Sequence, residues 1–174
     1  HLDCVSAERI EEELNKLLAA PQPGAYLEPE VLAFVLPELP PEELTKARRR
    51  IDALPAGTEQ VSARWAALLL PLGETGARKA LKRLKCSNAR IDGAAALVRE
   101  CGEKTPDALH KCDLRLQAKR LLGKYDLHTV RQLTALWTAL APEEKASFDA
   151  LRAEAEALTA QGVCCRISQL AVNG

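Results

Sequence analysis

Apolar residues recur along this chain at spacings of three and four, which is typical of amphipathic helices. The first such stretch runs from Cys4 to Leu18 and places Ile10 and Leu14 on one face. Ser6 stands where an N-cap is expected, and Glu8 follows in the first turn, where negative charge is favourable to the helix dipole. We therefore expect a capped helix that packs by one side.

The same periodicity continues to residue 160, with breaks marked by proline and glycine. Pro41 fits the first position of a helix, and Thr58 and Asp126 fit N-caps. Segment 30–36 is expected to be buried, and segment 58–72 to form the central core. With no candidate partner strands, we predict an all-α, bundle-like array of about nine helices without a sheet. The expected helices cover residues 4–18, 30–36, 41–54, 58–72, 74–86, 87–98, 106–123, 127–140 and 142–160.

Composition indicates a globular chain with a local basic region. The chain has 174 residues, is 47% hydrophobic and 28% charged, and carries no formal net charge. That balance by itself indicates neither a nucleic-acid nor a membrane partner. The charges are unevenly distributed along the chain. Residues 1–60 hold 12 acids and 6 bases, whereas residues 77–131 hold 14 bases and 6 acids. The middle of the chain is therefore a candidate anion-binding region.

The bases gather on two expected helices, 74–86 and 106–123, and at the turn after the first of them. Several such charges are what a surface that follows an RNA backbone needs, although the same residues are also typical of solvated faces and helix caps. Only six residues are Trp, Tyr or Phe, which favours a duplex stem over stacked single-stranded bases as the ligand. The candidate RNA-binding residues are Arg78, Lys79, Lys82, Arg83, Lys85, Ser87, Asn88, Arg90, Lys111, Arg115, Lys119 and Arg120.

The cysteines indicate a reduced environment rather than a metal site. Six cysteines form no C-x-x-C pair, and the chain has no secretory segment and no apolar run of membrane-spanning length. We expect a cytoplasmic protein with no membrane partner. We predict no metal site and no catalytic residue in these 174 residues.

Three stretches together resemble a known family. Ser6–Ile10, followed by Glu13 and a leucine-rich turn, is similar to the neck motif of the CCA-adding enzymes, the class II template-independent tRNA nucleotidyltransferases. The segment Arg166–Gly174 is similar to the start of that family's tail. Arg64–Leu70, with Leu84–Asn88 after it, resembles a helix and a turn of its body.

The resemblance implies a function for a longer parent chain. Such an enzyme adds C, C and A to tRNA 3′ ends from CTP and ATP with Mg²⁺; its body grips the acceptor and T-arm stem, and Glu8, Arg9 and Glu13 brace the helix that reads the nucleobase. The family's catalytic head, with a Gly-Ser loop and an Asp-x-Asp pair, is not found in this sequence. Since the chain contains no Met and ends in Asn-Gly, we expect a fragment that works with that head and that binds no cofactor and transfers no nucleotide alone.

The expected organisation is a neck-like region, 1–57, and a region of body and partial tail, 58–174. Two alternatives stay open at this point. One is a poly(A) polymerase of the same family, since what separates the two activities lies partly in the head. The other is a non-catalytic helical module that binds an acidic protein partner through its basic residues.

Overall fold

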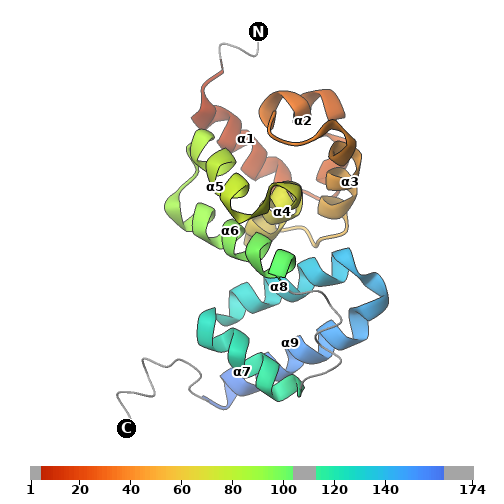
Figure 1. The fold of residues 1–174 in the computed structure, drawn as a ribbon, viewed down its shortest axis with the longest axis vertical. Helices are drawn as coiled ribbons and strands as arrows, with labels where there is room; N and C mark the ends of the chain where they lie inside the picture. The colour runs from red at the N-terminus through yellow and green to blue at the C-terminus, as the bar shows by residue number, and fades with distance from the viewer. Residues whose placement is uncertain (1–4, 104–112, 163–174) are drawn as a thin grey trace. The chain divides into compact units, whose positions relative to one another are not determined.

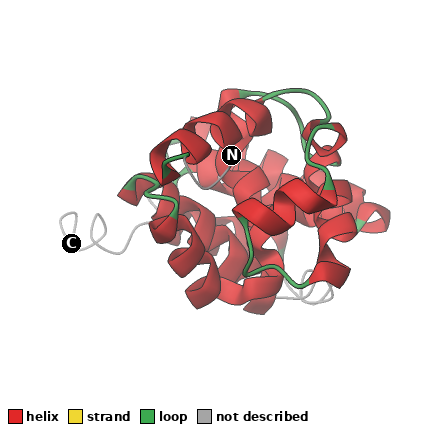
Figure 2. Cartoon of the chain, turned by 90° about the horizontal axis from the view of Figure 1, so that it is seen from above, coloured by secondary structure: helices red, strands yellow, loops and turns green. Residues whose placement is uncertain are grey.

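The computed structural model describes residues 5–103 and 113–162, and within them all regular structure is helical (Figures 1 and 2). The predicted all-α class is therefore confirmed. Short 3₁₀ turns join several of the helices. The helices are α1 (Ala7–Ala19), α2 (Pro29–Val35), α3 (Pro41–Asp52), α4 (Val61–Leu69), α5 (Gly73–Arg83), α6 (Asn88–Glu103), α7 (Leu114–Lys124), α8 (Leu127–Leu140) and α9 (Lys145–Ala160).

The chain divides into two compact units, His1–Glu103 and Lys104–Gly174. The first contains α1 to α6 and the second α7 to α9. The division predicted between residues 57 and 58 does not coincide with this boundary, because α4 packs against both α1 and α3. Each unit is described by itself below.

Helix α4 forms the centre of the first unit (Figure 1). All of its residues except Ser62 are buried, since alanines allow α1, α3 and α6 to approach it closely. Trp65 is fully buried, and its indole nitrogen donates to Asn15 Oδ1 of α1 at 2.8 Å. This helix is the central core expected from the apolar run.

A buried arginine joins three parts of the first unit. The side chain of Arg64 is 1% exposed and donates from Nη1 to the carbonyls of Leu18 (2.6 Å) and Ala20 (2.5 Å), and from Nη2 to that of Leu54 (2.8 Å). These carbonyls lie at the ends of α1 and α3, where helices leave acceptors without intrahelical donors. Burial lowers the pKa of this guanidinium, whereas the Asp52 carboxylate raises it. Arg64 therefore fixes where α1 ends relative to α3 and α4.

In the second unit, α7 and α8 both pack against α9. The Trp137 and Phe148 rings lie 5.8 Å apart in the core between α8 and α9. Asp126 caps α8 as predicted, by accepting from the Thr129 N–H at 2.8 Å. The 3₁₀ turn Pro142–Glu144 precedes α9, so this helix begins three residues later than its proline indicated.

Several predicted helix ends differ from the structure. Thr58–Gln60 is a 3₁₀ turn without a side-chain cap, and α4 begins only at Val61. Helix α5 ends at Arg83 rather than at residue 86. Helix α7 begins at Leu114, because the extended Asp113 caps it by accepting from the Arg115 N–H at 2.9 Å. The start predicted at residue 106 lies outside the described residues, as does Arg166–Gly174.

Candidate nucleic-acid interface

The turn from α5 to α6 is a tight corner with a lysine at its most strained position. The Lys85 N–H donates to the Lys82 carbonyl at 2.9 Å and the Cys86 N–H to the Leu81 carbonyl at 3.0 Å. This pair of bonds is the Schellman arrangement, which requires a left-handed residue and usually takes glycine. Lys85 is the left-handed residue here, with φ of 59°. The buried side chain of Cys86 then anchors the corner.

The start of α6 contributes polar groups to the same corner. Ser87 Oγ accepts from the Arg90 N–H at 3.2 Å, so Ser87 caps the helix that was expected to begin there. Ser87 and Asn88 are exposed. The side chain of Arg90 is half-buried, and its guanidinium donates to Ser62 Oγ at 2.7 Å. Arg90 therefore holds α6 against α4.

Two of the predicted arginines of α5 are used within the protein. Arg78 donates to Asp92 Oδ1 at 2.7 Å and to Glu74 Oε1 at 3.3 Å. Arg83 grips both oxygens of Glu38, at 2.5 and 2.9 Å, and the Val35 carbonyl at 2.8 Å. Burial raises the pKa of Glu38, but the hydrogen bonds and charge of Arg83 outweigh it and leave the pKa below its ordinary value. Much of the positive charge of these arginines is therefore neutralised.

Lys79 and Lys82 differ from these arginines. Both side chains are exposed on α5, and neither forms an ion pair within residues 5–103 and 113–162. They lie one turn apart on the helix surface. Together with the corner that follows, they are the part of the predicted patch that is available to an anionic ligand.

The neck-like helix reaches this corner through Glu8. Glu8 Oε1 lies 2.6 Å from Lys85 Nζ, although the two residues are 77 positions apart in the sequence. Both side chains are more than half exposed. The hydrogen bond from Lys85 is the main reason that the pKa of Glu8 lies below its ordinary value. A predicted brace residue and a predicted RNA-binding residue therefore lie in contact.

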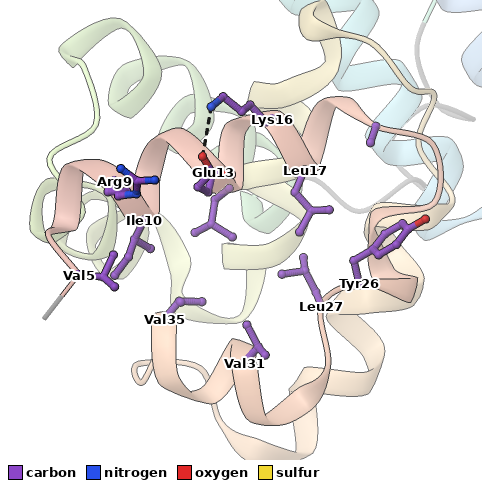
Figure 3. A pocket seen from close by; sticks show the side chains of 12 residues that line it. Val5, Arg9, Ile10, Glu13, Lys16, Leu17, Tyr26, Leu27, Val31 and Val35 are labelled. Carbon is purple, nitrogen blue, oxygen red and sulfur yellow. Dashed lines mark hydrogen bonds and ion pairs between the residues drawn. The ribbon is translucent and has the colours of Figure 1, made fainter. Parts of the chain in front are cut away.

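Arg9 and Glu13, the other two brace candidates, line a different surface of α1. They border an apolar groove between α1 and α2, where Glu13 lies 3.1 Å from Lys16 (Figure 3). The Arg9 N–H donates to the Ser6 cap at 3.3 Å, and its guanidinium is exposed. The structure does not bring the three residues together at one place.

In the described part of the second unit, the predicted RNA-binding bases lie on α7. Lys119 and Arg120 are exposed and form no ion pair in the described part of the chain. Arg115 lies 3.5 Å from Glu154 of α9. Lys111, also predicted to bind RNA, lies outside the described residues.

Sequence reasoning missed two features of the first unit. The buried Arg64 stands inside an apolar run, which is the signal that could have marked it as a helix-capping cation. The segment expected to be buried at 30–36 is only partly so, because Val31 is 42% and Phe34 39% exposed. Leu32, Val35 and Leu36 carry the packing instead.

The resemblance implies magnesium for the parent enzyme, and the described residues offer no cluster of ligands for it. No three His, Cys, Asp or Glu side chains among them are placed to hold a metal ion. We therefore assign no chemical step to them. Within the same residues, no helix is both long and apolar enough to cross a membrane. The comparisons with known proteins found no matching family model, no matching curated protein and no matching solved structure.

Proposed function

We propose that this chain is the tRNA-binding helical region of a CCA-adding tRNA nucleotidyltransferase. In the parent enzyme, a catalytic head on the same polypeptide would use CTP, ATP and Mg²⁺. The helices described here would hold the acceptor and T-arm stem. A cytoplasmic location belongs to the same proposal.

The observation that carries the proposal is the contact between Glu8 and Lys85. The resemblance rests on motifs far apart in the sequence, and two of them, the neck-like motif and the Leu84–Asn88 turn, meet at this ion pair. A chance likeness of separate segments gives no reason for such a meeting. The contact supports one continuous surface from the start of α1 to the α5–α6 corner.

We assign phosphate contacts to those predicted RNA-binding bases that are exposed and form no ion pair within the described residues. These are Lys79 and Lys82 in the first unit and Lys119 and Arg120 in the second. Arg78, Arg83 and Arg115 are tied to carboxylates, so they position helices and give less to binding. The proposed phosphate contacts are therefore fewer than the candidate RNA-binding residues predicted from the sequence.

Binding of a labelled tRNA that ends before CCA tests the proposal. The dissociation constant is measured by fluorescence anisotropy over a range of salt concentrations for the wild type and for Lys79→Glu/Lys82→Glu. Each lost phosphate contact should lower the slope of log K against log salt by about 0.9. We expect weaker binding and a slope smaller by about 1.8.

The matched control makes the same charge change elsewhere in the first unit. Lys46 and Lys16 are exposed to a similar degree, at 64% and 62%, and each lies beside acids. Lys16→Glu/Lys46→Glu should retain most of the affinity and the slope. If both double variants weaken binding equally, the α5 surface is not the site.

The two alternatives give different outcomes. A poly(A) polymerase region should bind single-stranded RNA of equal length at least as well as tRNA, whereas a stem-gripping body should prefer tRNA. The helical interaction module is a second candidate because an open apolar groove lies between α1 and α2. An absence of tRNA binding at low salt would favour that module.

A further inference from the structure

A small polar hollow of the first unit lies between α3 and the 3₁₀ turn Pro23–Ala25. Its volume is about 230 Å³, and its lining contains two arginines, one acid and otherwise neutral polar or small residues. These residues are Gln22, Gly24, Ala25, Thr45, Arg48, Arg49 and Asp52. Because no large apolar side chain lines the hollow, its walls suit a polar ligand.

The hollow is held in shape by the protein itself. Arg48 Nε donates to the Gly24 carbonyl at 2.8 Å, and the Gly24 N–H donates to Asp52 Oδ1 at 2.8 Å. A Cβ atom on Gly24 would collide with the Asp52 carboxylate, so only glycine allows the turn to lie this close to α3. A ligand would therefore find the walls already in place, which lowers the cost of binding.

Both arginines of the hollow have N–H groups to spare. Arg48 donates from Nε to Gly24, and its Nη1 and Nη2 atoms have no hydrogen-bond partner within the described residues. Arg49 is exposed and forms no ion pair in the same part of the chain. Arg50, the next residue, binds the Ala67 carbonyl and Glu43 instead. Two guanidiniums with unused donors at one hollow are suited to an oxyanion, which each can bind through two N–H groups.

The one acid of the lining does not cancel this charge. The Asp52 carboxylate accepts from the Gly24 N–H. Burial lowers the pKa of the Arg64 guanidinium, and the charge of Asp52 raises it, so this carboxylate also acts on a third, buried arginine. With two bases and one acid in the lining, and Arg64 behind it, the local balance is positive.

The end of α3 does not oppose an anion as strongly as a free helix end would. The carbonyls of the last turn carry the negative end of the helix dipole. Here the Arg49 carbonyl accepts from the Ala53 N–H at 3.1 Å, and the Ile51 carbonyl accepts from the Leu54 N–H at 3.2 Å. The Leu54 carbonyl accepts from Arg64 at 2.8 Å. These acceptors are occupied, so the guanidiniums dominate at the hollow.

We infer that this hollow, hereafter the α3 hollow, binds a phosphate group through Arg48 and Arg49, with the Thr45 hydroxyl as a further donor. Its volume lies below the range of pockets for drug-sized ligands, which points to a small ion or a small ester. The phosphate group can belong to inorganic phosphate or to a phosphate monoester. The inference does not depend on the proposed tRNA binding, because none of the bases assigned to RNA lines this hollow.

Titration of the 174-residue protein with inorganic phosphate and with methyl phosphate tests the inference. Backbone amide signals are followed by ¹H–¹⁵N NMR, which measures weak binding and locates it. The pH is set where phosphate is mostly doubly charged. Sodium chloride keeps the ionic strength constant, so that screening does not change during the titration. We expect saturable shifts at Gly24, Ala25 and Thr45, and none with sodium chloride alone.

Arg49→Gln and Lys46→Gln form a matched pair of variants. Each removes one positive charge from an exposed position of α3, but only Arg49 lines the hollow. Lys46 pairs with Glu43 of the same helix, a contact of small energy, so both variants should fold. We expect Arg49→Gln to weaken phosphate binding by at least about fivefold and Lys46→Gln by less than about twofold. Circular dichroism verifies folding, and Thr45→Val serves as a second variant of the hollow.

The source of the phosphate group follows from the two ligands. Methyl phosphate that binds at least as tightly as inorganic phosphate would support a monoester as the ligand. Tighter binding of inorganic phosphate would support the free ion.

Three results would overturn the inference. The first is an absence of saturable shifts with either ligand. The second is equal weakening by Arg49→Gln and Lys46→Gln, which would mean that phosphate responds only to the overall charge of α3. The third is a set of shifts confined to the corner between α5 and α6, which would place phosphate there. The affinity for tRNA is measured separately, and Arg49→Gln should leave it within about twofold of the wild type. A loss as large as that of Lys79→Glu/Lys82→Glu would assign the hollow to the RNA surface instead.

Discussion

Lys85 occupies a backbone conformation that side chains other than glycine rarely adopt. Its φ of 59° costs about 1 kcal/mol relative to glycine. The structural contact that the lysine side chain adds to this corner is an exposed ion pair with Glu8. Exposed pairs of this kind contribute little to stability. Residues kept in strained conformations cluster at functional sites, which is consistent with a functional role for the α5–α6 corner.

Replacing Lys85 by glycine and by alanine separates stability from binding. Both substitutions remove the ammonium group, but only glycine relieves the left-handed backbone. In urea unfolding followed by circular dichroism, we expect Lys85→Gly to be about 1 kcal/mol more stable than Lys85→Ala. Both variants should bind tRNA with the same affinity, because both lack the ammonium group. Equal stability of the two would mean that the turn has rearranged.

Arg64 is a second residue whose role is structural and local. Arg64→Met fills similar space but leaves the carbonyls of Leu18, Ala20 and Leu54 without this donor. Since a buried acceptor without a partner is costly, we expect the free energy of unfolding to fall by about 2–4 kcal/mol. Arg49→Met, an exposed change on α3, should alter it by less than about 0.5 kcal/mol. A loss below 1 kcal/mol for Arg64→Met would show that water replaces the guanidinium.

At the scale of elements, arginines on one helix repeatedly bind the end of another. Arg50 of α3 donates to the Ala67 carbonyl at 2.9 Å, near the end of α4. Arg48 donates to the Gly24 carbonyl at 2.8 Å, and Asp52 accepts from the Gly24 N–H at 2.8 Å. Arg83 of α5 binds the Val35 carbonyl and Glu38 in the connection from α2 to α3. These bonds hold short helices together where apolar contact alone is limited.

The Glu38–Arg83 contact should make stability depend on pH in one direction. The pKa of Glu38 is lowered in the folded state, so its contribution is fully present above the ordinary value of 4.5 and is lost as pH falls through the lower folded value. Comparing wild type with Glu38→Gln, we expect a difference in unfolding free energy below about 1 kcal/mol at pH 7 that shrinks below pH 4.5. Urea unfolding at several pH values measures it. A difference that grows on acidification would contradict the assignment.

Much of the element order follows from local signals in the sequence. Ser6, Ser87 and Asp126 were predictable as helix starts because each side chain accepts from a backbone N–H of the first turn. Pro41 was predictable because proline has no N–H and the first position of a helix needs none. The partners of Arg78, Arg83 and Arg90 were not predictable, since they depend on which helices pack together. For the same reason, sequence patterns indicated a basic stripe but not which of its charges are neutralised. The groove between α1 and α2 was missed because apolar periodicity alone does not distinguish a covered face from an uncovered one.

At the scale of the whole molecule, neither unit is strongly charged. Residues 1–103 hold 16 acids and 14 bases, and residues 104–174 hold 8 acids and 10 bases. The proposed RNA binding therefore depends on where bases are exposed and unpaired, on α5 in one unit and on α7 in the other. Weak binding by each unit can add up when one ligand contacts both.

A double-variant cycle across the two units tests whether one tRNA uses both surfaces. Lys79→Glu/Lys82→Glu alters the first unit and Lys119→Glu/Arg120→Glu the second. If one tRNA contacts both, each pair should lower the salt slope by about 1.8 and the fourfold variant by about 3.6. The losses in binding free energy should add within about 0.5 kcal/mol, because the pairs belong to separate units.

The same cycle has a clear opposing result. If each unit binds its own RNA, the stoichiometry at high protein concentration exceeds one RNA per chain, and each pair of substitutions removes one class of site without changing the affinity of the other. The Lys16→Glu/Lys46→Glu control, which matches each pair in charge, should leave the slope unchanged. Additive losses at a stoichiometry of one would support a single tRNA held by both units, since each lost contact then reduces the counterions released by the same RNA.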